Sequence, residues 1–264
     1  MVFYAPRKNA GAGKLEKKPV SPIVQFEKVT KNFDNLAVVD QISGSISQGE
    51  IISLVGPSGC GKSTLLRLIA GIEMPSEGEI QCHIQPEKIG FVFQDVRLLP
   101  WKTALENITF VLRDRFIAQW QQDAHARKAL ARVGLADFQD YLPAQLSGGM
   151  QKRVAIARAL AIKSELLLFD EPFSDLDLPL RILLIEDIHR LLKVGNKTAI
   201  YVTHDIREAL TLSDRIYILS ARPARIIGVI NLDKSHQKEK ELREIESQIF
   251  NVLQEETQKQ MEEK

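Results

Sequence analysis

The nine residues GPSGCGKST, from Gly56 to Thr64, could hold a polyphosphate. Gly56, Gly61, Lys62 and Ser63 fit the pattern G-x-x-x-x-G-K-[ST], in which glycines let backbone N–H groups wrap the α- and β-phosphates. Lys62 is then expected to reach the β- and γ-phosphates, Ser63 to ligate Mg²⁺, and Thr64 to support the α-phosphate. The alternative is a tight glycine turn without a ligand. The apolar run before the motif and the helical pattern after it provide the context that phosphate binding requires.

A second anion cradle is predicted where LSGGM, Leu146 to Met150, opens a helix. Small residues at a helix start leave the first backbone N–H groups open, and the helix dipole favours negative charge there. Such an N-terminus is a common anion site. One chain is therefore predicted to carry two phosphate-binding segments about ninety residues apart, although a single phosphate group would need only one of them.

Acidic and polar side chains follow three expected strands. Asp170 and Glu171 end the apolar run LLLFDE, where Asp170 could hold Mg²⁺ through water and Glu171 could polarise an attacking water. Gln94 and His204 each follow a strand-like run, and ligands bind at the carboxyl ends of strands in open parallel sheets. The alternatives are a helix cap or surface charge for the acidic pair, and satisfied structural residues for Gln94 and His204.

The elements that must position these residues alternate along the chain. Residues 23–33 and 36–50 read as strands joined by turns, an antiparallel opening, and the continuous apolar run 51–55 reads as a buried parallel strand. Further strands are expected over 88–94, 165–171, 198–204, 215–220 and 225–232, and helices over 63–71, 104–134, 146–160, 180–195 and 205–213. This alternation predicts a largely parallel α/β sheet, and residues 95–160 break it with helices alone, which predicts a helical subdomain.

Three segments are predicted: a flexible basic tail over 1–22, a main domain over 23–232, and a charged C-terminal helix over 233–264. In the last segment Leu242, Ile245, Ile249 and Leu253 recur at helical spacing, which indicates an amphipathic helix lying on the body.

Composition narrows the class of protein. The 264 residues are 44% hydrophobic and 26% charged with a formal net charge of +1, which allows a sizeable core and argues against a nucleic-acid surface made by net charge. No run approaches the ~18 apolar residues that span a bilayer, so membrane association would come through a partner. Cys60 and Cys82 form no disulfide framework and fit a reducing compartment. Because Cys60 lies inside the phosphate loop, we expect a bulky thiol reagent to inhibit ligand binding there, and a bound nucleotide such as ATP to protect the thiol.

The motifs GPSGCGKST, LSGGMQKR, LLLFDEP, SDLD and VTHD, with Gln94 between the first two, resemble those of the ATP-binding cassette (ABC) ATPases in order and approximate spacing. The resemblance spans residues 23–232. It implies a P-loop NTPase fold with a mainly parallel core sheet, an antiparallel β subdomain and an α-helical subdomain. In that family two cassettes pack head to tail around two ATP molecules, each held by the phosphate loop of one subunit and the LSGGM helix of the other. The second cradle would then serve the partner's ATP, and hydrolysis would open the pair.

The resemblance implies roles for individual residues. Glu171 would be the general base, Gln94 would contact Mg²⁺ and the water, and His204 would contact the γ-phosphate. Phe33 would stack on adenine, and Asp177 would lie in a loop across the dimer interface, where the nearby Asp175 replaces the alanine frequent in the family. The implied ATP-binding residues are Phe33, Gly56, Pro57, Ser58, Gly59, Cys60, Gly61, Lys62, Ser63 and Thr64; those for the partner's ATP are Ser147, Gly148, Gly149 and Gln151; those for Mg²⁺ are Ser63, Gln94 and Asp170.

A closer resemblance concerns FQDVRLLPWKTALENI and LSARPARIIGVINL, which look like the cassettes of bacterial importers for nitrate, sulfonates, taurine and bicarbonate. It implies a homodimer or a pair of related cassettes, a transmembrane permease, a periplasmic solute-binding protein, and a place on the cytoplasmic face of the inner membrane. The charge balance predicts no nucleic-acid partner. A short permease helix would dock in a groove after Gln94, with the candidate lining residues Leu98, Leu99, Pro100, Trp101, Phe110 and Phe116. The alternative is that these side chains belong to the core of the helical subdomain.

Two other classes stay open: a soluble cassette ATPase that acts as an assembly or regulatory factor without a permease, and a non-hydrolysing regulator, which would lack the base that Glu171 supplies.

Overall fold

A computed structural model describes residues 22–113, 118–162, 164–174, 176–232 and 239–262. The chain forms two compact units, one of residues up to Gln85 together with those from Leu192 onward, and one of Pro86–Leu191. The predicted tail falls almost wholly outside the described residues, and the predicted boundaries at 22, 95, 160 and 232 stay a prediction.

The first unit opens with an antiparallel sheet, as the sequence predicted. Strand β1 (Pro22–Phe33) pairs with β2 (Leu36–Ser47) along one edge and with β4 (Glu77–Cys82) along the other. Val24 and Phe26 of β1 are buried because alternate side chains of a strand share one face, and Val29 is buried beyond a register shift that follows Phe26. The sequence missed β4, whose residues EGEIQC are mostly exposed and carry no clear hydrophobic alternation.

Parallel strands form the rest of this unit. Strand β3 (Ile51–Val55) lies between β7 (Thr198–Val202) and β8 (Arg215–Leu219) and is parallel to both. Every residue of β3 and β7 is buried, which explains their continuous apolar runs. Strand β9 (Ile226–Asn231) is antiparallel to β8. Helix α1 (Lys62–Ile69) follows β3, and α6 (Ile206–Leu212) connects β7 to β8 and packs on β3.

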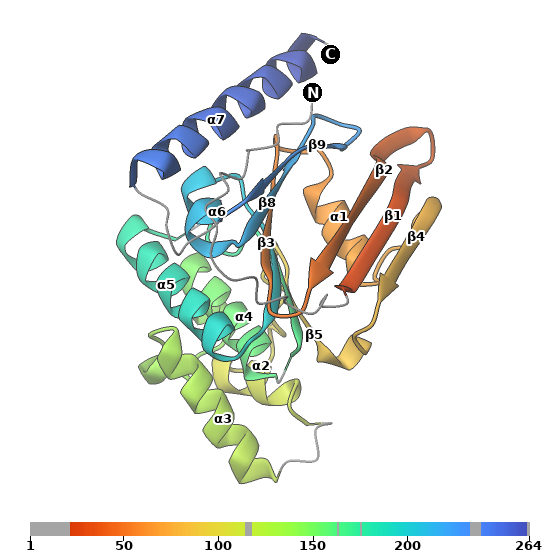
Figure 1. Cartoon of the computed structure of the whole chain (residues 1–264). Coiled ribbons are helices and arrows are strands. Elements are labelled where there is room, and N and C mark those ends of the chain that lie inside the picture. Colours follow the sequence, from red (N-terminus) through yellow and green to blue (C-terminus); the bar gives the residue numbers. More distant parts are fainter. Residues whose placement is uncertain (1–21, 114–117, 163, 175, 233–238, 263–264) are drawn as a thin grey trace, which may run out of the picture. The chain divides into compact units, whose positions relative to one another are not determined.

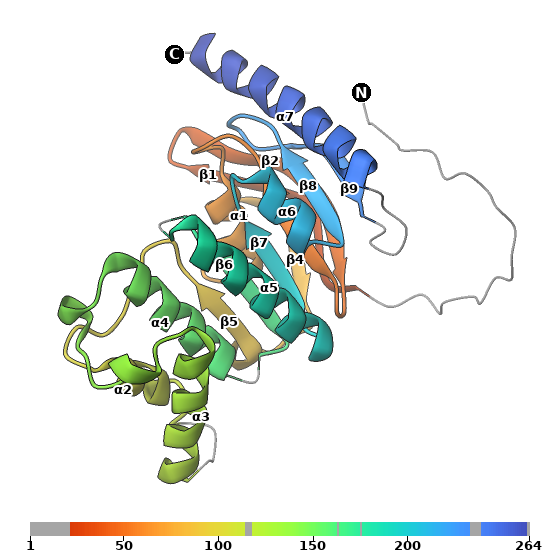
Figure 2. The same cartoon turned by 90° about the vertical axis from the view of Figure 1, so that its left-hand side faces the viewer.

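The C-terminal segment of this unit contains the long helix α7 (Glu239–Glu262). Its apolar face packs on a core cluster that includes Ala209, Leu210 and Ile218, and Ile249 is completely buried there. Leu242, Ile245 and Leu253 pack against the same cluster, as their spacing predicted. Figures 1 and 2 show α7 running outside α6 and the β8–β9 pair.

The second unit combines a parallel strand pair with helices. Strands β5 (Ile89–Val92) and β6 (Leu166–Asp170) are parallel neighbours. In the described part of this unit, four helices accompany them: α2 (Ala104–Phe110), α3 (Gln119–Arg132), α4 (Gly148–Ala161) and α5 (Leu178–Val194), the last of which ends beyond the unit. Short 3₁₀ turns lie at Pro86–Lys88, Ala136–Phe138 and Pro143–Gln145. Helix α3 packs against α2 and α4, and α4 packs against β5 (Figure 2).

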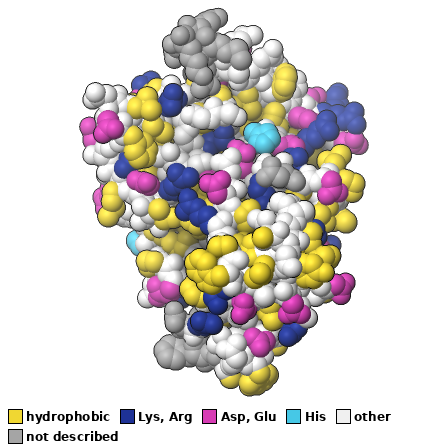
Figure 3. Space-filling model, turned by 180° about the vertical axis from the view of Figure 1, so that it is seen from behind, with side chains coloured by type: hydrophobic (Ala, Val, Ile, Leu, Met, Phe, Trp, Pro, Cys, Tyr) yellow, Lys and Arg dark blue, Asp and Glu magenta, His cyan; other side chains and the backbone are white. Residues whose placement is uncertain are grey.

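The predicted fold class, an α/β fold with parallel strands, a separate antiparallel sheet and a group of helices, is confirmed. Among the described residues, no helix is both long enough and apolar enough to cross a bilayer. Lys and Arg side chains are interspersed with Asp and Glu over the face drawn in Figure 3, as the small net charge suggests.

Candidate nucleotide site

The glycine loop between β3 and α1 adopts a conformation that requires glycine. Gly59 and Gly61 have φ angles of +73° and +122°. A Cβ added to Gly61 would lie 2.8 Å from the carbonyl oxygen of Val38, whereas one added to Gly59 would meet no described atom within 4 Å. The loop can therefore bring its backbone close to a ligand at Gly59, while Gly61 is fixed by its neighbours.

Lys62 lies on this loop at the start of α1. Its side chain is 5% exposed, and Nζ donates to the carbonyl oxygens of Gly56 and Pro57, each at 2.8 Å. No acidic residue occupies the first turn of α1, and no described side chain caps its N-terminus. The first N–H groups of α1 and the ammonium of Lys62 thus gather at one loop, an arrangement that fits the phosphates of a nucleotide.

Cys60 lies in the same loop, but its thiol is turned into the protein interior. Its side chain is fully buried, with Sγ 3.0 Å from a Cβ added to Gly56. Burial raises the pKa of the Cys60 thiol, which the charge of Lys62 only partly offsets. A buried, protonated thiol is a poor nucleophile, so we expect a bulky reagent to modify Cys60 only slowly in the folded chain.

Two further predicted residues belong to the first unit. Phe33 ends β1 with 41% of its surface exposed, and Lys31 Nζ lies 4.8 Å from its ring centroid. Lys31 is itself held by the Met74 carbonyl at 2.8 Å and by Glu73 at 3.3 Å. A ring with a fixed cation over one face suits stacking of a base on the other. His204 follows β7 and is exposed.

The second cradle is the N-terminus of α4 in the second unit. Ser147 is the N-cap, and its Oγ accepts a hydrogen bond from the Met150 N–H at 3.3 Å. Ser147 and Gly148 are exposed, and a Cβ added to Gly148 would meet no described atom within 4 Å. The helix start is therefore open to an approaching anion.

Gln151, predicted to contact the partner's ATP, has an internal role in this structure. Its Nε2 donates to the carbonyls of Pro143 at 3.0 Å and Leu146 at 3.1 Å. These bonds hold the backbone segment that leads into α4.

The two acids and Gln94 lie at one edge of the β5–β6 pair. Val92 pairs with Phe169, and Gln94 and Glu171 each follow two residues later. Asp170 is completely buried, and Glu171 has a φ of +47°. A non-glycine residue in the left-handed region costs about 1–3 kcal/mol and is frequent at active sites, so this strain marks Glu171 as a functional candidate.

Asp177 is exposed and precedes α5 directly, where its carbonyl accepts from the Arg181 N–H at 2.9 Å. Burial lowers the pKa of the Arg153 guanidinium, and the charge of Asp177 partly opposes this shift. Asp175 lies outside the described residues.

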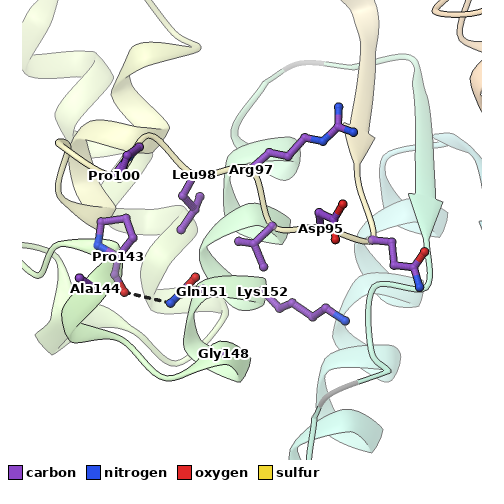
Figure 4. Close-up of a pocket in the computed structure, with 11 residues that line it drawn as sticks. Asp95, Arg97, Leu98, Pro100, Pro143, Ala144, Gly148, Gln151 and Lys152 are labelled. Atoms are coloured by element: carbon purple, nitrogen blue, oxygen red, sulfur yellow. Dashed lines mark hydrogen bonds between the residues drawn. The ribbon is translucent and has the colours of Figure 1, made fainter.

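A cavity of about 550 Å³ opens in the second unit beside α4 (Figure 4). Two of the predicted groove residues, Leu98 and Pro100, line it, whereas Leu99, Trp101 and Phe110 do not, and Phe116 lies outside the described residues. The other lining residues are Gln94, Asp95, Val96, Arg97, Pro143, Ala144, Gly148, Gln151 and Lys152.

Asn107 supports this cavity and was missed by the sequence reasoning. It is 1% exposed, and its side chain bonds both backbone groups of Leu99 and the carbonyls of Lys102 and Thr103 at 2.8–3.2 Å. An asparagine inside a helical pattern was the only signal, because Asn is unfavourable there unless its amide has a local partner.

Among the described residues, no three His, Cys, Asp or Glu side chains gather as a self-sufficient metal site. The candidate Mg²⁺ residues fit an ion shared with a ligand, since Mg²⁺ is usually held by one or two protein groups together with phosphates and water.

Residues 39–174 match the family described as ABC transporter. An uncharacterized ABC transporter ATP-binding protein of Methanocaldococcus jannaschii is 39% identical over 250 residues, which cover 90% of this chain and 94% of that protein. The chain belongs to the ABC transporter family. It is an ABC ATPase.

Other relatives differ in the solute that their names give. The Fe(3+) ions import ATP-binding protein of Escherichia coli K12 is 42% identical over 78% of this ABC ATPase, which spans only 61% of that relative's length. The aliphatic sulfonates import ATP-binding protein of Pseudomonas syringae is 46% identical over 74% of this chain and 80% of its own.

A solved dimer of an ATP-binding cassette in a post-hydrolysis state, bound to ADP and Pi, matches this ABC ATPase with a TM-score of 0.73 and 32% identity. The match covers 80% of this chain and 99% of the other.

Proposed function

We propose that this ABC ATPase binds and hydrolyses ATP to drive a bacterial importer for a small anion of the nitrate, sulfonate, taurine or bicarbonate class. The observation that carries the proposal is the presence of two helix N-termini, at Lys62 and Gly148, that follow small residues and have no acidic residue in the first turn, in two units of one chain. Each can receive phosphates, so one chain offers two half-sites.

In the first unit we assign the phosphates to the loop Gly56–Thr64, with Lys62 binding the β- and γ-phosphates and Phe33 stacking on adenine. Ser63 provides a hydroxyl for Mg²⁺. When bound, Mg²⁺ neutralises developing charge on the phosphates. His204 contacts the γ-phosphate from the end of β7.

In the second unit Glu171 is the general base and accepts the proton of the attacking water. Gln94 orients that water and contacts Mg²⁺, and Asp170 supports the metal. Ser147, Gly148 and Gly149 face the ATP of a second cassette, and Asp177 lies at the interface. Two chains therefore complete each other's sites, which makes nucleotide binding and pairing interdependent.

Replacement of Glu171 tests the base and the pairing together. Glu171→Gln removes the proton acceptor but keeps size and hydrogen bonding, so ATP-bound pairs should accumulate with little turnover. Size-exclusion chromatography with ATP measures the pairs, and phosphate release measures turnover.

Glu186→Gln is the matched control, because Glu186 is exposed on α5 of the same unit. It should hydrolyse ATP as the wild type does. Normal turnover of Glu171→Gln would reject the base assignment. Monomers that hydrolyse ATP at full rate at any dilution would reject the shared site.

The partner in the membrane is proposed to be a permease, bound through a short helix in the cavity beside α4. Leu98 and Pro100 supply apolar surface there, and Arg97 and Lys152 supply positive charge. Such docking would place the chain at the cytoplasmic face of the membrane without a span of its own.

The solute class rests on the LLPW and ARP segments and on the 46% identity to the sulfonate relative. A periplasmic binding protein would deliver the solute. Uptake of labelled taurine, nitrate and bicarbonate by cells with and without the gene tests the class. Loss of iron or polyamine uptake alone would overturn it, since Fe(3+) and spermidine/putrescine import relatives are 42% and 43% identical.

A further inference from the structure

His204 stands in a short link between β7 and α6 that is held from both sides. The Thr203 N–H donates to the Leu54 carbonyl at 3.3 Å, which ties the link to β3, the strand that leads into the phosphate loop. On the other side, Asp205 caps α6, with Oδ1 accepting from the N–H groups of Arg207 at 2.8 Å and Glu208 at 3.3 Å. The backbone on both sides of His204 is thereby fixed.

The Thr203 hydroxyl joins these two anchors. It accepts from the Asp205 N–H at 3.0 Å and donates to Glu208 Oε2 at 2.5 Å. A hydroxyl has a single proton, so donation to Glu208 turns an oxygen lone pair toward Asp205. The Glu208 carboxylate thus determines how the hydroxyl holds the link around His204.

Glu208 and Thr203 are both buried, at 6% and 2% exposure, whereas His204 is exposed. Burial, and after it the charge of Glu208, raise the pKa of the neighbouring Tyr201 well above its usual value. A buried carboxylate is unfavourable unless it is hydrogen bonded, so packing of the core alone does not account for a glutamate at position 208. Because both side chains are buried, we expect them to act through the backbone around His204 and not by direct contact with a ligand.

We propose that Glu208, acting through the Thr203 hydroxyl, is a positioning residue for His204. Glu208 holds the imidazole of His204 at the position where it would contact the γ-phosphate. This proposal rests on the role of His204 proposed above. Because the effect is one of geometry, its loss should lower the rate of hydrolysis and leave the affinity of the phosphate loop for ATP almost unchanged.

Thr203→Val is the sharpest variant, because valine keeps the shape and the β-branched stem but removes the hydroxyl. We expect kcat to fall about tenfold or more, since small displacements of catalytic groups have effects of that size. Thr203→Ser should restore most of the rate. Thr211→Val is the control on α6, the helix that carries Glu208: Thr211 Oγ1 donates to the Arg207 carbonyl at 2.8 Å, away from the link, and kcat should not change.

A double-mutant cycle with His204→Ala separates positioning from a purely structural effect. If Thr203 acts through His204, adding Thr203→Val to His204→Ala should lower kcat by less than about twofold beyond the loss in His204→Ala alone. A full additional loss there would overturn the proposal, as would wild-type turnover of Thr203→Val alone. Normal turnover of His204→Ala itself would instead reject the proposed role of His204, a different result.

Glu208→Gln and Glu208→Ala provide a second route. Glutamine keeps an acceptor for the Thr203 hydroxyl and should retain more of the rate than alanine does. Binding of a fluorescent ATP analogue and the midpoint of thermal unfolding are measured for both. The positioning role would be overturned if the loss of kcat in each variant were explained by the fraction of unfolded protein. In that case the glutamine and alanine variants would have the same kcat per folded molecule.

Discussion

Two glycines of the phosphate loop allow a paired test of the backbone geometry. Gly59 and Gly61 both have positive φ, at +73° and +122°, but only Gly61 faces the chain closely, with the Val38 carbonyl oxygen 2.8 Å from an added Cβ. Alanine at Gly59 would be near the left-handed well, which costs about 1–2 kcal/mol. Alanine at Gly61 would lie outside the left-handed well. Its Cβ would also clash with the carbonyl oxygen of Val38, which is a backbone atom and cannot move aside as a side chain can.

For Gly61→Ala the two effects are of similar size. Backbone strain contributes about 1–3 kcal/mol. Overpacking against the Val38 carbonyl contributes a further amount of about 1–3 kcal/mol. We therefore expect Gly61→Ala to lower the free energy of unfolding by about 2–6 kcal/mol, two to three times the effect of Gly59→Ala.

The assay is denaturant unfolding without nucleotide, so that strain is measured apart from ligand binding. Tryptophan fluorescence and circular dichroism should give the midpoint for each variant. Equal losses for Gly59→Ala and Gly61→Ala would refute the reasoning, because they would show that the Val38 contact has no consequence. A larger loss for Gly59→Ala would refute the loop geometry itself.

Three further predictions concern buried groups. Ile249→Ala should cost about 3 kcal/mol in unfolding free energy, because large-to-small changes at fully buried sites remove transfer energy and leave a cavity. Its neighbour Phe250→Ala, at a side chain 57% exposed, should cost less than about 1 kcal/mol in the same denaturant titration; equal losses would contradict the docking of α7. Glu256 accepts from the Ala221 N–H at 2.9 Å and from Lys259 at 2.6 Å; burial alone would raise the pKa of its carboxyl, but these bonds outweigh burial and lower it. A carboxyl group whose pKa is lowered in the folded state stabilises the fold at pH values above its unfolded-state pKa. The difference in unfolding midpoint between wild type and Glu256→Gln should therefore be complete at pH 7 and disappear as the pH falls below about 4. A difference that does not depend on pH would contradict this prediction. An aromatic disulfide reagent should titrate the half-buried Cys82 first and Cys60 only slowly, with both reacting fast in denaturant; rapid reaction of two thiols in the native protein would show that Cys60 is accessible.

Local spacing was enough to find most elements and most candidate site residues. The apolar runs at Ile51–Val55 and Leu166–Asp170 predicted buried parallel strands because strands covered on both faces must be apolar throughout. The phosphate loop was found for a similar reason, since its glycines and Lys62 act within nine consecutive residues. Chemistry that depends on near neighbours in the chain is visible in the sequence.

The placement of groups distant in the chain was decided only by the tertiary structure. Strand β4 pairs with β1 although its residues are polar, because backbone groups rather than side chains make that ladder. The inward turn of Cys60 and the four hydrogen bonds of Asn107 depend on which segments pack beside them.

The sequence by itself determined that the chain carries a nucleotide loop, a second helix N-terminus for an anion, and an acid pair after a strand. It also placed His204 at a strand end. Only the fold decided that the link around His204 is held by a buried Thr203–Glu208 hydrogen bond, because burial and hydrogen-bond geometry arise when β7 and α6 pack together and have no signature in residue order.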